Sequence, residues 1–235
     1  MNYFLDTCVE LGYVFCTDPW NDKSVKVFDE TDYLHYSYCV DREFDKKYHE
    51  FLKEQKNLFY SLRDKLKIEN PDKLLSLDTL ILKSKIIPLK RDFNENKKEK
   101  CVEIFWEFCK AKHEYDVDLK INVCKVQHLL NRISRFIRSF ERGIKNRRAD
   151  FERKVIYHSK RNKKYPKLLK ELENNNIHYP DYCIILDAHD LSLTENLDLE
   201  FITADNKMAI NANNIIGLLN IQKFHYLKEY SFDKH

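Results

Sequence analysis

Short apolar runs and helix-spaced apolar patterns alternate at the beginning of the chain. Residues Tyr3 to Leu5 are continuously apolar, and apolar residues from Val9 to Val14 then recur at helical spacing. A run of this length is typical of a strand buried on both faces, and three-and-four spacing is typical of an amphipathic helix. The pattern predicts a buried strand with Asp6 at its carboxyl end, followed by a helix.

The next segment repeats this alternation on a small scale. It predicts a helix over Ser24 to Phe28, a strand over Tyr33 to Tyr36, and a helix that begins near Val40. Ser37 stands where it could cap that third helix, and Glu43 falls in its early turns.

The middle of the chain, from Phe44 to about Asn175, has a helical pattern with loops near Pro71, Pro88 and Asn94. Its clearest helix runs from Val126 to Val155, where the apolar residues line one face. The remaining surface of this helix is basic and carries the candidate RNA contacts Arg132, Arg135, Arg138, Arg142, Lys145 and Arg148. Such a surface can follow an RNA backbone, although a solvated helix face is an equal alternative. The run from Lys160 to Lys164 extends it.

The end of the chain returns to the alternating style of the beginning. It predicts, in order, a helix, a strand, a helix and a strand over Tyr182 to Leu191, Leu199 to Thr203, Asn213 to Leu219, and Phe224 to Leu227. Alternating strands and helices at both ends predict an α/β fold with a central parallel sheet and a large helical insertion. We expect residues 1–60 and 165–235 to form the sheet domain and residues 61–164 to form the insertion.

Composition narrows the class of protein. Of the 235 residues 34% are charged, yet the net charge is only +3, which excludes a nucleic-acid binder that depends on an overall positive field. The seven cysteines include no CxxC pair, so a zinc site is not indicated. No apolar run approaches the ~20 residues that a membrane-spanning helix needs. We therefore expect a cytoplasmic protein with no membrane partner.

Four acidic residues stand out by their positions in this pattern. Asp6 and Asp205 each follow a predicted strand, and the crevice of a parallel sheet lies at the carboxyl ends of its strands. Glu43 and Asp181 lie near the beginnings of helices. Clustered carboxylates repel one another unless a cation is present, and all-oxygen ligands favour Mg²⁺ or Mn²⁺. The chemistry that such a site suggests is phosphodiester hydrolysis.

The segments around these acids resemble the motifs of the PIN domain family. "FLDTCVELGYVF" is similar to the family's entry motif, "HYSYCVDREF" to its second, "PDYCIILDAHDL" to its third and "FITADNK" to its fourth, all in family order. The resemblance covers roughly residues 1–60 and 165–230. It implies a three-layer α/β/α fold and a metal-dependent ribonuclease whose catalytic and metal-binding acids are Asp6, Glu43, Asp181 and Asp205. Members of the family include VapC-like toxins and RNA-processing enzymes.

Each acid also has a structural alternative. Asp6 could cap a helix, Asp205 could form a turn, Glu43 could lie on a solvated helix face, and Asp181 after Pro180 could simply begin a helix. The identity of the third acid also has alternatives within the same predicted helix. The apolar helix pattern selects Asp181, whereas spacing from Asp205 favours residues such as Asp187, with Asp190 as a further reserve.

The sequence therefore predicts a metal-dependent endoribonuclease that hydrolyses RNA with Mg²⁺ or Mn²⁺. The alternative is a catalytically inactive PIN-like module that binds RNA or forms a complex, since a fold does not fix a function. The partners expected from the resemblance are the RNA substrate, an antitoxin-like or processing-complex protein, and a second copy of the chain in a homodimer.

Overall fold

The computed structural model describes residues 1–31, 33–90, 93–111, 123–159 and 163–230. The chain forms two compact units, which we call the sheet unit (Met1–Lys47 with Asn146–His235) and the helical unit (Tyr48–Lys145). The predicted divisions after residues 60 and 164 differ from these because α3 (Tyr38–Lys67) and α6 (Val126–Lys154) each contribute to both units. Because each boundary falls inside a continuous helix, the hydrophobic pattern of the sequence does not change there and could not reveal it.

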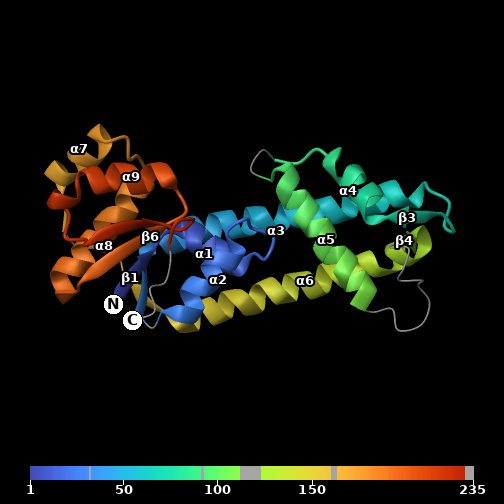
Figure 1. Ribbon diagram of the computed structural model, residues 1–235, viewed down its shortest axis with the longest axis horizontal. Coiled ribbons are helices and arrows are strands. Elements are labelled where there is room, and N and C mark those ends of the chain that lie inside the picture. The colour runs from blue at the N-terminus through green and yellow to red at the C-terminus, as the bar shows by residue number, and fades with distance from the viewer. Residues whose placement is uncertain (32, 91–92, 112–122, 160–162, 231–235) are drawn as a thin grey trace. The chain divides into compact units, whose positions relative to one another are not determined.

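The sheet unit is built on five parallel strands (Figure 1). Across the sheet their order is β5 (Val155–His158), β2 (Tyr33–Ser37), β1 (Asn2–Leu5), β6 (Leu199–Thr203) and β7 (Lys223–Tyr226). The α/β class and the central parallel sheet are thus confirmed. Counted in chain order the strands run 3-2-1-4-5, so the direction of winding reverses between β1 and β6. A ligand crevice is expected at such a switch point, outside the carboxyl ends of the strands.

Helices connect the strands over both faces of the sheet. The bounds are α1 (Thr7–Val14), α2 (Asn21–Glu30), α7 (Pro166–Asn174), α8 (Asp181–Glu195), α9 (Asn206–Asn214) and the 3₁₀ turn η1 (Ile216–Leu218). Right-handed connections place α1 and α2 on one face and α7, α8 and α9 on the other, consistent with three layers (Figure 1). Stacked Phe4 and Phe201 fill one interface, and Tyr13, Phe28 and Phe151 fill the other.

The register at the switch point brings two loops level with each other. Leu5 pairs with Ile202, and the Asp6 backbone N–H donates to the Ile202 carbonyl oxygen at 3.0 Å. Both strands are buried where they end, because Leu5 and Ile202 have no exposed surface. The next residues of the two strands, Asp6 and Thr203, therefore emerge side by side at the carboxyl edge.

The helical unit has its own hydrophobic core. It contains the second part of α3, β3 (Leu74–Ser76), α4 (Leu77–Lys85), α5 (Glu95–Ala111), β4 (Val123–Lys125) and the first part of α6. β3 and β4 pair antiparallel. Phe59, Phe105 and Phe136 form an aromatic cluster with centroids 4.8–5.7 Å apart at the centre of this core. In the described residues no helix has the length and apolar character needed to cross a membrane.

Several elements differ from those predicted. β3, β4 and β5 have only three or four residues, which is too short for a strand period to stand out from a helical pattern. The last helix begins at Asn206, directly after Asp205, and not at Asn213, because the Asp205 carboxylate caps it. α3 begins at Tyr38, and the buried Ser37 hydroxyl has no hydrogen-bond partner in the described residues, so the predicted cap is absent.

Gly12 and Gly143 make a matched pair for testing helix packing. A Cβ at Gly12 would lie 2.3 Å from the Ser24 hydroxyl oxygen and 3.2 Å from the Cβ of Trp20, whereas a Cβ at Gly143 would meet nothing within 4 Å. We expect Gly12→Ala to lower the free energy of unfolding by ~1–3 kcal/mol through overpacking of α1 against α2. Gly143→Ala should raise it by ~0.5–1 kcal/mol, since alanine favours helix. Urea unfolding measures both; equal effects would contradict the packing.

Candidate active site

Asp6 lies at the centre of the carboxyl edge and is almost completely buried. Its Oδ1 accepts from the Thr7 backbone N–H at 2.7 Å, which caps α1. Its Oδ2 accepts from the Thr203 hydroxyl at 2.7 Å and from the Cys8 thiol at 2.8 Å. Burial raises the pKa of Asp6, and the hydrogen bonds from Cys8 and Thr203 offset part of that increase. The capping alternative therefore holds, and it leaves the second oxygen facing β6.

Thr203 joins two of the predicted acids. Its hydroxyl donates to Asp6 and accepts from the Asp205 backbone N–H at 2.9 Å. Cys8 makes a parallel link, because its sulfur also accepts from the Ala204 backbone N–H at 2.9 Å. The loop that carries Asp205 is thus fixed to the end of β1 by two side chains.

Asp205 and Asp181 each come from the beginning of a helix. Asp205 caps α9, its Oδ1 accepting from the backbone N–H groups of Lys207 at 2.8 Å and Met208 at 3.0 Å. Asp181 is the first residue of α8 and makes no capping bond. In the described part of the chain its carboxylate has no hydrogen-bond or ion-pair partner.

Glu43 lies in the second turn of α3, and donors of the chain occupy both of its carboxylate oxygens. Oε2 accepts from the Thr7 hydroxyl at 2.8 Å, and Oε1 pairs with the Lys47 ammonium at 2.5 Å. Burial lowers the pKa of Lys47, but the hydrogen bond and charge of Glu43 and the charge of Asp6 outweigh it, so the pKa is raised overall. Lys47 therefore stays protonated within the acidic site.

The electrostatics show that the four acids share one region. The pKa of Asp181 is raised to about 7, chiefly by burial and then by the negative charges of Asp6, Glu43 and Asp205, while Lys47 lowers it. These residues come from β1, α3, α8 and the loop after β6. We call Asp6, Glu43, Asp181 and Asp205 the carboxyl-edge acids.

The two reserve acids for the third position face elsewhere. Asp190 accepts a hydrogen bond from the Tyr165 hydroxyl. At about 100° and 1.5 Å per residue, Asp190 lies half a turn round α8 from Asp181 and about 13 Å along it, and Asp187 lies about 9 Å along it. Both are buried within α8. The structure thus places Asp181, and not its reserves, with the other three.

The carboxyl-edge acids fit a hard divalent cation by their chemistry. They offer only oxygen donors, and their mutual repulsion is the conflict that Mg²⁺ or Mn²⁺ would relieve. Within the residues that the structure describes, however, no three His, Cys, Asp or Glu side chains already stand where they could hold an ion together. Hydrogen bonds hold Asp6, Glu43 and Asp205 in their present rotamers, so an ion would have to turn these side chains inward.

Among the predicted RNA contacts, the structure separates engaged side chains from free ones. Arg148 pairs with Asp45 at 2.7 Å and Glu152 at 2.9 Å. Lys145 pairs with Glu141 at 3.3 Å, and Arg132 donates to His128 at 2.9 Å. Of the run from Lys160 to Lys164, residues 160–162 lie outside the described residues.

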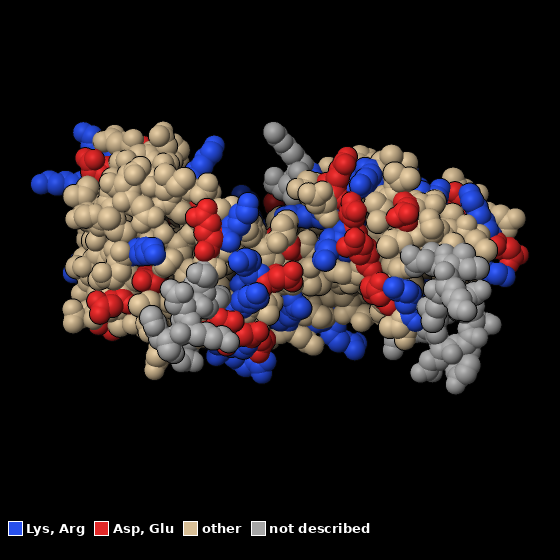
Figure 2. Space-filling model, in the orientation of Figure 1, with Lys and Arg blue, Asp and Glu red and all other residues tan. Residues whose placement is uncertain are grey.

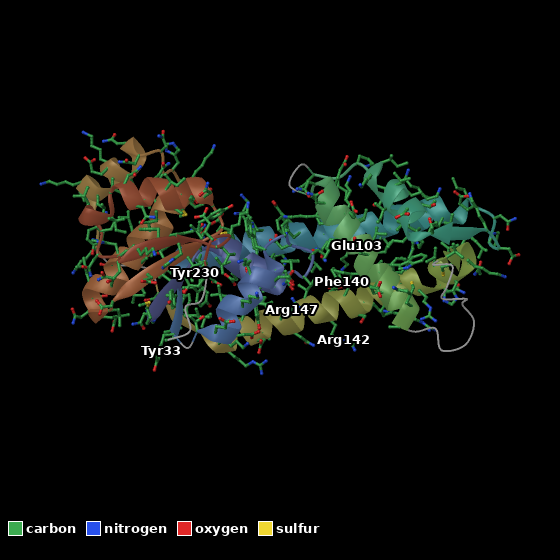
Figure 3. The ribbon with its side chains drawn as sticks, viewed as in Figure 1. Tyr33, Glu103, Phe140, Arg142, Arg147 and Tyr230 are labelled. Atoms are coloured by element: carbon green, nitrogen blue, oxygen red, sulfur yellow. The ribbon has the colours of Figure 1, made fainter. Side chains whose placement is uncertain are left out.

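Arg135, Arg138 and Arg142 form what we call the arginine stripe. They are exposed and have no acidic partner in the described residues, and their spacing of three and four puts them on one face of α6. In Figure 3, Arg142 and Phe140 lie on opposite sides of α6, and Phe140 packs against the hydrophobic core of this unit. Elsewhere on the visible face, acidic and basic side chains are interspersed (Figure 2).

Sequence reasoning missed three members of the site. It named none of Thr7, Cys8 and Lys47 as part of the site, although Lys47 follows Glu43 at the i,i+4 spacing that pairs opposite charges on a helix. That spacing was the available signal for Lys47. Cys8 had no comparable signal, because the contact that ties it to the loop of Asp205 is with Ala204, almost two hundred positions away.

Thr203→Val tests whether the link between β1 and β6 supports the site. Valine keeps the shape of threonine but removes the hydroxyl that serves Asp6 and Asp205. We expect the affinity for Mn²⁺ to fall ~10–100-fold, as for other residues that orient ligands. Isothermal titration measures it, and Thr194→Val, which removes a hydroxyl bonded only to carbonyl oxygens of its own helix, is the control. Equal affinity in both variants would contradict the proposed link.

In comparisons with known proteins, no protein-family model, curated protein or solved structure matches this chain. Its own residues are therefore the basis for any functional conclusion.

Proposed function

We propose that the protein is a PIN-like, metal-dependent endoribonuclease whose carboxyl-edge acids hold Mg²⁺ or Mn²⁺. The observation that carries the proposal is that Thr7 and Thr203 bind Asp6, Glu43 and Asp205 to one edge of the sheet, where their charges also raise the pKa of Asp181. Carboxylates that share a partly buried region repel one another, and a bound cation would relieve that repulsion. The topology adds support, because these acids stand at the switch point of a parallel sheet.

The contacts of each residue at this edge indicate its role in the proposed reaction. Such an ion, when bound, lowers the pKa of water and neutralises charge on a scissile phosphate. Asp6 is oriented by Thr7, Cys8 and Thr203, and it would exchange part of these hydrogen bonds for the ion. Asp181 has no partner of its own in the described residues and is the acid that can turn most freely towards a ligand. Lys47 supplies the positive charge nearest Glu43.

RNA as substrate is supported by the arginine stripe in the helical unit. Exposed arginines without acidic partners bind phosphates without regard to sequence, and each contact contributes salt-dependent affinity. Arginines that are already paired, such as Arg148, contribute less to RNA affinity, because a phosphate must first displace the carboxylate that they bind.

The proposal is tested by incubating the purified chain with a mixed RNA pool and Mn²⁺ and identifying the new ends. Hydrolysis by water leaves no 2′,3′-cyclic phosphate, whereas attack by the neighbouring 2′-hydroxyl does. We expect cleavage without cyclic ends, and none with EDTA. Cyclic phosphate ends would contradict the mechanism.

A second candidate function is a non-catalytic module that binds RNA or assembles with a protein through the same fold. The observation that favours it is that no three potential ligands in the described residues already stand close enough to hold an ion. This candidate predicts RNA binding that Mn²⁺ does not change and RNA that stays intact.

Replacing all three residues of the arginine stripe with alanine tests the RNA surface. We expect RNA affinity to fall and the slope of log K against log salt to become shallower by about 2–3, since each phosphate contact contributes about 0.7–0.9. Fluorescence anisotropy at several salt concentrations measures the slope. The control replaces Lys73, Lys83 and Lys125 of the same unit, which pair with Glu69 and Asp72. An equal loss in both triple variants would show that only net charge matters.

A further inference from the structure

Trp20 and Tyr226 form an aromatic pair at the carboxyl edge of the sheet. Tyr226 is the last residue of β7 and pairs in register with Thr203 of β6, whose hydroxyl binds Asp6. The Leu227 backbone N–H donates to the Thr203 carbonyl oxygen at 2.8 Å, so β6 and β7 stay paired to their ends. The ring centroids of Trp20 and Tyr226 are 5.8 Å apart, with an angle of 70° between the ring planes. The aromatic pair therefore lies beside the strand end that supports the candidate active site.

Hydrogen bonds fix the backbone of Trp20 between α1 and α2. Its N–H donates to Asp18 Oδ1 at 3.0 Å, and its carbonyl oxygen accepts from the Ser24 N–H at 2.8 Å. The next residue, Asn21, donates from its side chain to the Gly12 carbonyl oxygen at 2.7 Å, which ties this segment to α1. A ligand that binds Trp20 therefore meets a segment that is already ordered, which lowers the entropic cost of binding.

Both side chains of the pair are only half-buried. In the described part of the chain, the Trp20 indole N–H and the Tyr226 hydroxyl have no hydrogen-bond partner. Buried tryptophan and tyrosine side chains usually find such a partner, and those that keep one side in water are enriched at binding surfaces. Trp106, by contrast, is 2% exposed in the core of the helical unit. The Trp20–Tyr226 pair thus offers accessible aromatic surface with unused polar groups.

Two lysines near this edge provide positive charge for a nucleotide. Lys228 follows Tyr226 by two residues, and Lys207 follows Asp205 by two residues in the first turn of α9. Both are exposed, and neither has an ion pair in the described residues. Lysines bind phosphates whatever the base, whereas an aromatic ring binds the face of an unpaired base by stacking. Together they match the two chemical parts of a nucleotide.

We propose that Trp20 and Tyr226 form a binding site for one unpaired base of the RNA, beside the phosphate that the carboxyl-edge acids would cleave. The base stacks on the accessible surface of these rings, and Lys207 and Lys228 contact neighbouring phosphates. A base inside a duplex is already stacked on its neighbours and does not enter such a site. The inference rests on RNA as the proposed substrate, and it adds the residues that recognise the base.

The test measures quenching of tryptophan fluorescence in the full-length protein, with EDTA present so that the RNA is not cut. The chain has two tryptophans, and Trp106 is too deeply buried for a base to reach. A short single-stranded oligoadenylate should quench Trp20 by stacking. An abasic ribose-phosphate oligomer of the same length should not, because it has phosphates and no bases. Quenching by both oligomers, or by neither, would overturn the base site without the need for any variant.

Trp20→Leu and Trp20→Phe separate stacking from packing. Both keep an apolar side chain, but only phenylalanine keeps an aromatic face. Affinity for oligoadenylate, measured by fluorescence anisotropy of labelled RNA, should fall about 5- to 100-fold in Trp20→Leu, the range for the loss of one stacked base. It should fall much less in Trp20→Phe, and neither variant should change the affinity for the abasic oligomer. Equal losses in the two variants, or an equal loss for the two oligomers, would overturn the proposal.

Tyr33→Leu is the matched control. Tyr33, which Figure 3 labels, is 55% exposed and begins β2, so it lies at the amino edge of the sheet. This variant should keep the wild-type affinity, and a loss equal to that of Trp20→Leu would overturn the base site. Mn²⁺-dependent cleavage is measured separately. Cleavage by a protein whose fluorescence does not respond to bases would overturn the base site alone, whereas base-dependent quenching without cleavage would support the base site and overturn the ribonuclease.

Discussion

Asp6→Asn is expected to reduce Mn²⁺-dependent RNA cleavage about a hundred- to a thousandfold, the scale on which one preorganised electrostatic group acts. Asparagine is nearly the same size, but it carries no charge to attract a cation. Its amide has one accepting oxygen where the carboxylate has two, so its NH₂ group would face a donor in either orientation, the Thr7 N–H or the Thr203 and Cys8 groups. Single-turnover cleavage of a labelled RNA measures the effect.

The matched control for Asp6→Asn is Asp198→Asn. Asp198 directly precedes β6, so it lies at the amino edge of the sheet, opposite the carboxyl-edge acids. Removing its charge should leave cleavage unchanged. If the two variants cleave RNA equally well, the carboxyl edge is not the active site.

Asp181→Asn is expected to separate stability from metal binding. The folded-state pKa of Asp181 is about 7, whereas its ordinary value is 3.8, so the folded protein holds this proton more tightly than the unfolded chain does. Stability is then lost as pH rises from about 4 to about 7. Because the side chain is partly open to solvent, we expect asparagine to stabilise the metal-free protein at pH 8 by only ~1–2 kcal/mol, and by less at pH 5.

Urea unfolding at both pH values, with EDTA or with Mn²⁺, measures this separation. Mn²⁺ should stabilise the wild type at pH 8 and have no effect on Asp181→Asn. Asp190→Asn is the control from the same helix. It should lose stability at both pH values, because the Tyr165 hydroxyl loses a charged partner, and it should still respond to Mn²⁺. The reverse result would make Asp190 the third acid.

The strand ends were the part of the site that sequence could predict. Asp6 and Asp205 follow buried strands, and the carboxyl ends of parallel strands meet at one edge whatever the details of packing. Asp181 needed more, since the apolar helix pattern selected it while spacing from Asp205 favoured Asp187, with Asp190 in reserve. Only the pitch of α8 and the Tyr165 contact separated them.

The partners of the acids depended on contacts that no local pattern contains. Cys8 touches Ala204, and Thr7 touches Glu43, across turns of the fold that sequence spacing does not encode. The same holds for the basic helix. Its arginines look alike in sequence, but Arg148 is held by Asp45, an acid on another helix, whereas Arg138 is free of acidic partners in the described residues.

The short strands were missed for a different reason. β5 follows α6 without a turn residue, and its four residues continue a run that also suits a helix. Only pairing with β2, more than a hundred residues earlier, makes it a strand. In the same way, the Asp205 cap sets the residue at which α9 begins, and the spacing of apolar residues does not.

The most direct measurement is the rate at which the wild-type chain cleaves RNA as Mn²⁺ is added to protein first stripped with EDTA. The rate should be negligible without the ion, rise to a plateau with Mn²⁺, and return to the baseline when EDTA is restored. Cleavage that proceeds equally well in EDTA, or intact RNA at saturating Mn²⁺, would contradict a metal-dependent ribonuclease.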